Sequence, residues 1–277
     1  MRVDLHLHSN HSDGVLTPTD LMALCAARRV EWAALTDHDT TRGCAEAAVA
    51  CAALGIRYTA GVEVTLGWRG QELHLIGLAF EREHPVLQQH LSNVRHLRHE
   101  RLLEIGRRLQ RKSGIAAETI TEQLCANSRP ESPTRLHLAR ALVAAGHATD
   151  VNHAFSRWLA RGQPGYVPAE WPNLETTMTA LAAAGARCVL AHPHRYKLSA
   201  GALRALLGEY RELGGHAIEV SIGGMSPNDL DRLATLARRF GLLASTGSDF
   251  HDPNTPWNTP GRFAKLPADL EHVAVRL

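Results

Sequence analysis

Short apolar runs that predict buried strands recur along this chain, and most of them are separated by a helical pattern. The seven runs cover residues 2–8, 31–37, 57–64, 72–79, 187–192, 216–222 and 242–248. Segments between them, such as "TPTDLMALCAARR" and "SPNDLDRLATLARRFG", have the apolar spacing of amphipathic helices. Strands that alternate with helices pair in parallel, because each helix carries the chain back to the start of the next strand. We therefore expect an α/β fold with one sheet or barrel of mostly parallel strands.

The repeat is interrupted in the middle of the chain, where the pattern is helical and no strand is predicted. The long basic segment "HLRHERLLEIGRRLQRKSG" is followed by "SPTRLHLARALVAAG". In the second segment we expect Ser132 as the N-cap, Pro133 as the first helical residue and Gly146 at the C-terminal end. The chain is thus predicted to form an α/β body of residues 1–85 and 170–277, with residues 86–169 as a helical insertion over one end.

The composition argues against several functional classes. A chain of 277 residues with a formal net charge of +2 is too near neutrality to coat nucleic acid or a membrane surface through charge alone. No apolar run approaches the roughly 18 residues of a membrane span, and no secretory signal pattern opens the chain, so we expect a cytoplasmic protein. The five cysteines form no CxxC pair and are expected to be reduced thiols in the core. Nothing indicates an obligate protein partner.

The first strand-like run has two chemically different faces. Because alternate residues of a strand share a face, Val3, Leu5 and Leu7 are expected to pack outward against helices. Asp4, His6 and His8 would then point into the barrel. Asp4 lies one step deeper than the histidines, and we expect it to support a ligand from behind or to be a structural acid, and not to be a metal ligand itself.

Ionisable residues follow almost every predicted strand, and histidine, with 17 copies, is over-represented. Any one of them taken alone is explained equally well as a strand-end side chain bonded to the backbone. Together they point to one place, because the carboxyl ends of parallel barrel strands meet at a single face. Imidazoles mixed with carboxylates suit Mn, Fe or Zn. The candidate metal ligands are His6, His8, Asp13, His38, Glu63, His74, His192, Asp249 and His251.

The motifs "DLHLHSNHSDG", "LTDHDT", "GVE", "HLIGL", "AHPHRY" and "GSDFH" occur in this order along the chain. They are similar to those of the PHP (polymerase and histidinol phosphatase) family of metal-dependent phosphoesterases. The segments "TRLHLARALVAAGHATD", "AFSRWLARGQPGYVP" and "IEVSIGG" resemble the PHP subgroup that removes the 3′-phosphate from nucleoside 3′,5′-bisphosphates and trims RNA from its 5′ end. The resemblance covers nearly the whole chain. It implies a distorted (β/α)7 barrel with a helical cap over a trinuclear metal site.

The resemblance also implies how three divalent metal ions would be shared, with Mn²⁺ as the main expectation and Fe or Zn as alternatives. The expected sets are His6, His8, Glu63 and Asp249 for one ion, Asp13, His38 and His251 for a second, and Glu63, His74 and His192 for the third. Some family members carry histidine where Asp13 stands, so nearby His11 is an alternative ligand. The spacing favours Asp13.

The activity that the resemblance implies is hydrolysis of a bisphosphate such as pAp to AMP and phosphate, with trimming of short 5′-phosphorylated RNA as a second activity. Metal ions that activate water make a nucleophilic Ser or Cys unnecessary, and the chain has neither a GxSxG motif nor a P-loop. We expect Arg195 to bind the phosphate, and His194 or Asp37 to protonate the departing ribose oxygen. An equally good role for Asp37 is to orient a ligand histidine.

A substrate with two phosphates needs a second anion site. Arg135 is the main candidate, because it lies in the first turn of a predicted helix, where backbone donors and the helix dipole favour an anion. The basic segment from 95 to 112 could instead be a solvated helix face, which weakens the case for its arginines. His90 and His96 are expected at the surface or rim. The other expected substrate contacts are His137, Arg98, His99, Arg101, Asp13 and His38.

Two other functions compete with this interpretation. Histidinol-phosphate phosphatase shares the metal site, but its substrate offers only one phosphate. A nucleic-acid-binding or proofreading module with structural metals would use the basic helix on backbone phosphates. The near-neutral charge and the 5% aromatic content argue against that module.

Overall fold

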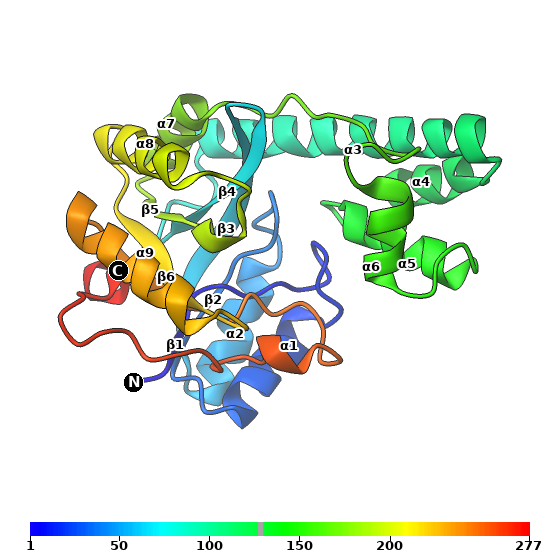
Figure 1. Ribbon diagram of the computed structural model, residues 1–277. Coiled ribbons are helices and arrows are strands. Elements are labelled where there is room, and N and C mark those ends of the chain that lie inside the picture. Colours follow the sequence, from blue (N-terminus) through cyan, green and yellow to red (C-terminus); the bar gives the residue numbers. More distant parts are fainter. Residues whose placement is uncertain (127–129) are drawn as a thin grey trace.

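The computed structural model describes residues 1–126 and 130–277, and it places all seven predicted strands in one sheet. The strands are β1 (Val3–Asp4), β2 (Trp32–Leu35), β3 (Arg57–Trp68), β4 (Gln71–Leu78), β5 (Arg187–Leu190), β6 (Ala217–Ile222) and β7 (Leu243–Gly247). They follow one another in sequence order across the sheet. The Leu5 N–H donates to the Thr246 carbonyl at 3.1 Å, which joins the first strand region to the last. The expected α/β barrel is therefore confirmed, nearly closed on itself (Figure 1).

One strand departs from the expected parallel pairing. β4 is antiparallel to both of its neighbours, β3 and β5, whereas the other neighbouring strands pair in parallel. Arg69 and Gly70 join β3 to β4 with φ values of 46° and 75°, and two positive φ values in a two-residue loop favour a tight hairpin. As a result Glu63 and His74 lie within long strands and not at strand ends.

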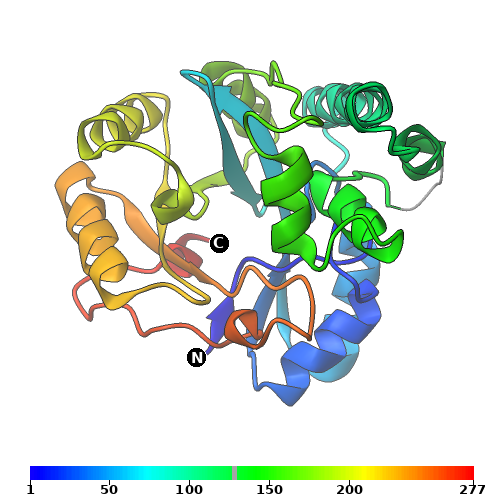
Figure 2. The same ribbon diagram turned by 45° about the vertical axis from the view of Figure 1, so that its right-hand side comes forward.

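Five helices surround the barrel (Figures 1 and 2). They are α1 (Pro18–Ala27), α2 (Cys44–Leu54), α7 (Leu174–Ala183), α8 (Ala200–Glu212) and α9 (Pro227–Phe240). Their apolar faces pack against the outward side chains of the strands in two large clusters. All five cysteines are free thiols, and all but the half-buried Cys125 are buried, as expected. Three 3₁₀ turns complete the body: Pro193–Arg195, Pro256–Asn258 and Val273–Arg276.

The barrel interior is apolar around the beginning of the first two strands. Val3 and Leu5 pack there with Trp32, whereas Leu7 packs outside with Leu21 of α1. The expectation that Val3, Leu5 and Leu7 share the outer face is therefore wrong. The β1 ladder ends at Asp4, and beyond it the backbone no longer keeps the two-residue period.

Asp4 has the structural role we expected, on the face opposite to the expected one. It pairs in register with Ala33, whose side chain packs toward the helices. Its carboxylate accepts backbone N–H bonds from Ser248 at 2.9 Å and Gly261 at 2.8 Å. Asp4 therefore ties the end of β7 and the C-terminal segment to the first strand.

The helical insertion follows β4. It contains α3 (Pro85–Ser113), α4 (Ala117–Ala126), α5 (Arg135–Ala144), α6 (Val151–Ala154) and a π-helical turn (Phe155–Leu159). Among its described residues there is no strand, as predicted, and residues 127–129 of the predicted insertion lie outside the described part. The insertion has an apolar core of its own, formed between α3, α4 and α5. None of the helices that the structure describes is both long and apolar enough to cross a membrane.

The predicted start of α5 is wrong by two residues. Thr134, and not Ser132, is the N-cap: its hydroxyl accepts the Leu136 N–H at 3.1 Å. His137 Nδ1 accepts the Thr134 N–H at 3.0 Å and completes a capping box with an imidazole in place of the usual carboxamide or carboxylate. Pro133 therefore precedes the helix, and Gly146 follows the C-cap residue with a φ of 77°.

Candidate metal centre

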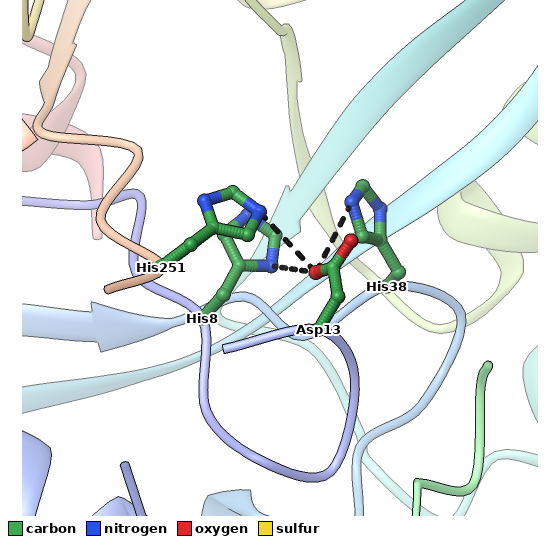
Figure 3. Close-up of side chains that lie close together, drawn as sticks. All are labelled: His8, Asp13, His38 and His251. Atoms are coloured by element: carbon green, nitrogen blue, oxygen red, sulfur yellow. Dashed lines mark ion pairs between the residues drawn. The ribbon is translucent and has the colours of Figure 1, made fainter. Parts of the chain in front are cut away.

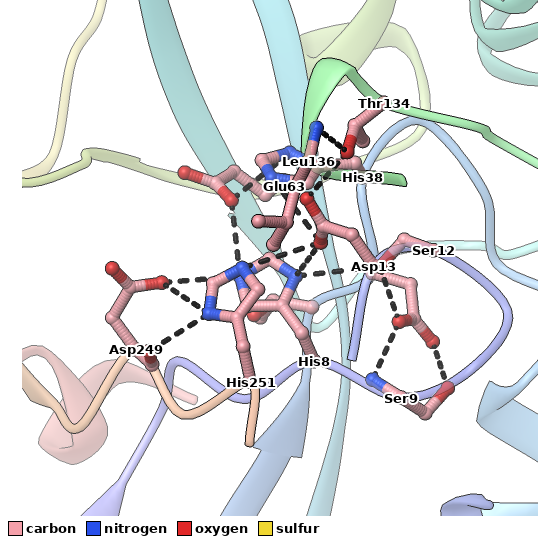
Figure 4. Close-up of polar contacts among 12 residues, drawn as sticks. His8, Ser9, Ser12, Asp13, His38, Glu63, Thr134, Leu136, Asp249 and His251 are labelled. Atoms are coloured by element: carbon pink, nitrogen blue, oxygen red, sulfur yellow. Dashed lines mark hydrogen bonds and ion pairs between the residues drawn. The ribbon is translucent and has the colours of Figure 1, made fainter. Parts of the chain in front are cut away.

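The nine predicted ligands converge at the mouth of the barrel, where their nitrogen and oxygen atoms form four overlapping groups able to hold a metal ion. Figure 4 shows His8, Asp13, His38, Glu63, Asp249 and His251 with the polar residues around them. The four groups are His8, Asp13, His38 and His251; His6, Glu63 and His192; His6, His8 and Asp249; and His38, Glu63 and His74. The union of these groups is the predicted set, and the alternative ligand His11 belongs to none of them.

Asp13 is the centre of one group (Figure 3). Its Oδ1 lies 3.2 Å from His251 Nε2, 3.8 Å from His38 Nε2 and 3.9 Å from His8 Nδ1. The other oxygen, Oδ2, accepts a hydrogen bond from the Thr134 hydroxyl at 2.9 Å. The N-cap of α5 thus holds one carboxylate oxygen and leaves the other to the imidazoles.

Glu63 bridges the rest of the cluster with its two oxygens. Oε2 lies 3.2 Å from the nearest nitrogens of His6, His8 and His38. Oε1 lies 3.0 Å from His74 Nδ1 and 2.8 Å from His192 Nε2. A carboxylate in this position can bind one ion with each oxygen, because each faces a separate set of imidazoles.

Asp249 completes the group around the first two histidines. Its Oδ1 lies 3.3 Å from both His6 Nε2 and His8 Nε2. The backbone of Asp249 has a φ of 52° and that of His192 a φ of 31°, values that cost free energy in residues other than glycine. Such strain persists only where the surrounding structure over-determines it, and here it brings two side chains to the cluster.

Unpaired buried atoms show that these residues fit a metal ion. Asp13 Oδ1, His38 Nδ1 and Glu63 Oε2 are buried and make no hydrogen bond. Such atoms are costly unless another partner satisfies them. A cation among them would provide that partner.

The pKa values of the cluster agree with a cation site. Burial alone would raise the pKa of Glu63, but the imidazoles of His38, His6 and His74 hold it well below its usual range. Burial lowers the pKa of His8, yet the adjacent carboxylates of Asp249 and Glu63 outweigh it and raise the pKa to about 10. The carboxylates thus favour a proton on His8, whereas burial lowers the pKa of His38 to about 3 and leaves its imidazole free to bind a cation. A bound divalent ion would replace the proton on His8.

The sequence analysis missed Glu219, which orients the cluster from the interior side of β6. His6 Nδ1 donates to Glu219 Oε1 at 2.9 Å, so Nε2 is left to face the cluster. Glu219 Oε2 accepts the backbone N–H of His192 at 2.6 Å. One carboxylate therefore fixes two predicted ligands, and its only signal in the sequence is an acid inside the apolar run "AIEVSI".

Asp37 belongs to the loop that carries the first ligands. Its carboxylate accepts hydrogen bonds from the Ser9 N–H at 2.7 Å, the Ser9 hydroxyl at 2.6 Å and the Ser12 hydroxyl at 2.7 Å. With these bonds it anchors the turn between His8 and Asp13. The hypothesis that Asp37 is the proton donor is not supported by this position, and it orients no ligand histidine directly.

A pocket of about 550 Å³ opens on one side of the cluster and contains two predicted catalytic residues, His194 and Arg195. Arg195 pairs with Asp249 Oδ2. Burial, followed by the nearby charge of Arg195, lowers the pKa of His194 to about 4. The remaining wall residues are Leu136, Asn152, Gly223, Gly224, Asp249, His251, Trp257 and Asn258.

The model of the PHP domain matches residues 4–163. This chain belongs to the PHP-domain family. It is 39% identical over 96% of its length to a 3′,5′-nucleoside bisphosphate phosphatase from Chromobacterium violaceum, of which the alignment covers 92%. It is also 39% identical over 98% of its length to the 5′-3′ exoribonuclease Rnm of Escherichia coli, again covering 92%.

A solved structure confirms the PHP barrel. An amidohydrolase from Chromobacterium violaceum, with bound sulfate and no metal, superposes with a TM-score of 0.92 at 37% identity. The superposition covers 100% of this chain and 95% of the other. The expected family and the expected distorted α/β barrel are therefore both confirmed.

Two of the predicted substrate-binding arginines meet beside the PHP metal centre. Arg101 Nη1 lies 2.7 Å from Glu72 Oε2, and Arg135 Nη2 lies 3.3 Å from Glu72 Oε1. The Trp171 indole N–H donates to the same carboxylate at 2.9 Å. Burial would raise the pKa of Glu72, but Arg135 and Arg101 lower it far below its usual range. Sequence reasoning missed Glu72, although it precedes His74 by two residues and so shares its face of β4.

The third predicted arginine has another partner. Arg98 is buried and pairs with Asp39, whose Oδ1 also accepts the Thr65 N–H at 2.7 Å. The interpretation of Arg98 as part of a solvated helix face is wrong, because this buried guanidinium joins α3 to the PHP barrel. Its contact with substrate stays a prediction.

None of the described histidines of the insertion belongs to a group able to hold a metal ion. Nδ1 of His137 is used in the α5 capping box. His99 is half-buried, and its carbonyl lies 3.8 Å from the Cys125 thiol that donates to it. His96 is exposed, as expected, whereas His90 is buried at 6% exposure, contrary to its predicted surface position. Its place on the barrel-facing side of α3, between Leu87 and Leu91, explains that burial.

Proposed function

We propose that this PHP-domain protein is a metal-dependent phosphatase that hydrolyses the 3′-phosphate of nucleoside 3′,5′-bisphosphates, such as pAp, and also trims short 5′-phosphorylated RNA. The names of its 39% identical relatives support both activities. Both reactions break the same kind of bond, between phosphorus and the 3′-oxygen of a nucleotide that carries a 5′-phosphate. A single site therefore serves both.

The observation that carries this proposal is the placement of Arg101 and Arg135 around Glu72, next to His74 on β4. Strand residues two positions apart lie about 7 Å from each other. The distance from the metal cluster to the two guanidinium groups is therefore roughly the length of a ribose between its 3′- and 5′-phosphates. This arrangement suits a substrate that has one phosphate at the cluster and a second at the arginines.

We propose three divalent ions, with Mn²⁺ as the first choice and Fe or Zn as alternatives for this mixture of imidazole and carboxylate donors. The first would be held by His6, His8, Glu63 and Asp249, the second by Asp13, His38 and His251, and the third by Glu63, His74 and His192. Divalent ions in such a site lower the pKa of water and neutralise phosphoryl oxygens.

The surrounding residues would orient the substrate and supply a proton. Arg195 is bound to Asp249 at the pocket wall, and its remaining guanidinium N–H groups can donate hydrogen bonds to a phosphate. His194 lines the same pocket, and we assign to it the proton that the departing 3′-oxygen needs. Because burial and the charge of Arg195 lower its pKa to about 4, His194 can carry that proton only once the bound phosphate offsets the Arg195 charge. Glu219 keeps His6 Nε2 turned toward the cluster. Arg135 and Arg101 would bind the 5′-phosphate in exchange for part of their contact with Glu72.

Replacing Arg135 by alanine tests the proposal. Hydrogen bonds to charged groups contribute roughly 1.5–3 kcal/mol, so we expect kcat/KM for pAp to fall about 10- to 100-fold. Turnover of p-nitrophenyl phosphate, which has no 5′-phosphate, should change much less. Both rates are measured on the metal-loaded protein.

Arg157→Ala is the matched control, because Arg157 is an exposed arginine of the same insertion. It should alter neither rate. If Arg135→Ala slowed hydrolysis of pAp and of p-nitrophenyl phosphate equally, Arg135 would not be the residue that binds the 5′-phosphate. A wild-type preference for histidinol phosphate over pAp would overturn the proposed function, as would salt-sensitive binding of long nucleic acid without phosphatase activity.

A further inference from the structure

Trp257 is an exposed aromatic side chain at the edge of the candidate metal centre. It is 60% exposed, and among the described residues no other Trp, Tyr or Phe side chain is classed as exposed. It belongs to the short turn Pro256–Asn258, drawn in orange-red in Figure 2. Because the indole is exposed in the wall of the pocket that contains His194 and Arg195, its face is available to a ligand in that pocket that can stack on it.

The turn that carries Trp257 is fixed to the cluster. The neighbouring Asn258 donates from Nδ2 to the carbonyl of Asp249 at 3.1 Å. Gly224 lies beside the indole, where a Cβ at that position would be in van der Waals contact with Trp257 Cδ1 at 3.5 Å. The turn that carries the indole is thus fixed relative to a predicted metal ligand.

Trp257 and the two arginines lie at different parts of the barrel mouth. Arg101 and Arg135 gather at Glu72 on β4. Trp257 shares its pocket with Asp249 and His251, which follow β7. β5 and β6 lie between those two strands in the sheet. A nucleoside bisphosphate that spans the cluster and the arginines would therefore leave the Trp257 side of the pocket unfilled.

We infer that Trp257 stacks on the base of the nucleotide that follows the scissile phosphate in a 5′-phosphorylated oligoribonucleotide. This inference rests on the proposed function and adds the feature that selects RNA over a bisphosphate. In the reaction, water adds to phosphorus and the bond to the 3′-oxygen of the first nucleotide breaks. The 3′-oxygen takes a proton, and the phosphate leaves as the 5′-phosphate of the second nucleotide, whose base lies on the indole.

The experiment compares pAp, the 5′-phosphorylated dinucleotide pApA and an analogue of pApA in which the second nucleotide is abasic. Stacking of one base on an aromatic side chain raises binding affinity by about ten-fold. We expect the ratio of kcat/KM for pApA to that for pAp to fall about ten-fold in Trp257→Ala. Trp257→Phe should restore most of the ratio. The abasic analogue should show the same loss with the wild-type protein and no further loss with Trp257→Ala.

Val49→Ala is the matched control, since Val49 is an exposed apolar residue on α2, and it should leave the ratio unchanged. An unchanged ratio in Trp257→Ala would overturn the inference. An equal further loss on the abasic analogue would also overturn it, because the indole would then act without the base. If the wild type hydrolyses pAp and not pApA, the inference about Trp257 is wrong, whereas the proposed phosphatase activity still holds. If it hydrolyses neither, the proposed function fails with it.

Discussion

Glu219 illustrates how a single buried side chain prepares the metal centre. It is fully buried, and its two oxygens bind His6 Nδ1 at 2.9 Å and the backbone N–H of His192 at 2.6 Å. A carboxylate behind a ligand imidazole fixes its tautomer and raises its basicity. The bond to the His192 N–H also helps hold that residue in its left-handed backbone conformation.

Replacing Glu219 by glutamine should weaken metal binding about 10-fold, because the neutral amide no longer strengthens the His6 imidazole. The amount of metal retained after dialysis against a graded chelator series measures this effect independently of activity. Glu212→Gln, an exposed glutamate on α8, is the control and should retain metal as the wild type does. Equal retention by the two variants would show that Glu219 does not support the site.

The long helix α3 and the shorter α4 show how one residue type sets the distance between two elements. Gly106 on α3 lies where a Cβ would approach Thr121 Oγ1 to 2.3 Å and the Glu118 Cα to 3.0 Å. The Thr121 hydroxyl is held by the Glu118 carbonyl at 2.8 Å and has little room to move. The two helices therefore pack closely only because α3 has a glycine at this turn.

Gly106→Ala should lower the free energy of unfolding by about 1–3 kcal/mol through this steric overlap. Gly208→Ala on α8 is a control of opposite sign, because its nearest neighbour would be Phe240 Cε1 at 3.9 Å. There the better helix propensity of alanine should add up to about 1 kcal/mol. Urea unfolding followed by circular dichroism measures both changes. A gain in both variants would contradict the close α3–α4 contact.

At the scale of the whole molecule, the insertion is joined to the barrel through buried polar contacts next to the metal centre. Arg98 of α3 pairs with Asp39, which follows the ligand His38. Thr134 and Arg140 of the insertion bind the carboxylate and the carbonyl of Asp13. Figure 4 shows Thr134 beside Asp13 and His38. Movements of the insertion would therefore reach Asp13 directly and His38 through the adjacent Asp39.

Arg98→Met should lower the free energy of unfolding by roughly 3–5 kcal/mol, because Asp39 would be left buried without its cation. Adding Asp39→Asn should recover part of the loss, since the double variant buries no unpaired charge. Urea unfolding of the wild type, both single variants and the double variant measures the coupling. A loss below about 1 kcal/mol in Arg98→Met would indicate a solvated pair, contrary to its burial.

Much of the metal centre could be predicted from the sequence, because most predicted ligands are polar residues at or near the end of an apolar run, and Glu63 and His74 are polar residues inside one. The positions of His6, His38 and Asp249 in short motifs are enough to predict a shared face once the chain is known to form a barrel. Strand existence was equally predictable from apolar patterning. The direction of β4 was harder to predict, since pairing depends on a two-residue turn and on neighbours far along the chain.

Partnerships between distant residues were decided by the tertiary structure alone. His6 and Glu219 are 213 positions apart, and Arg98 and Asp39 are 59 positions apart. No local pattern distinguishes a buried arginine that holds a barrel loop from one that meets substrate, since the same long side chain serves both. The sequence by itself determined which side chains can bind a metal ion, through their type and their place in each βα unit. Only the packed chain decided which acids orient them and which arginines remain near the mouth, because burial and charge pairing arise from long-range contacts.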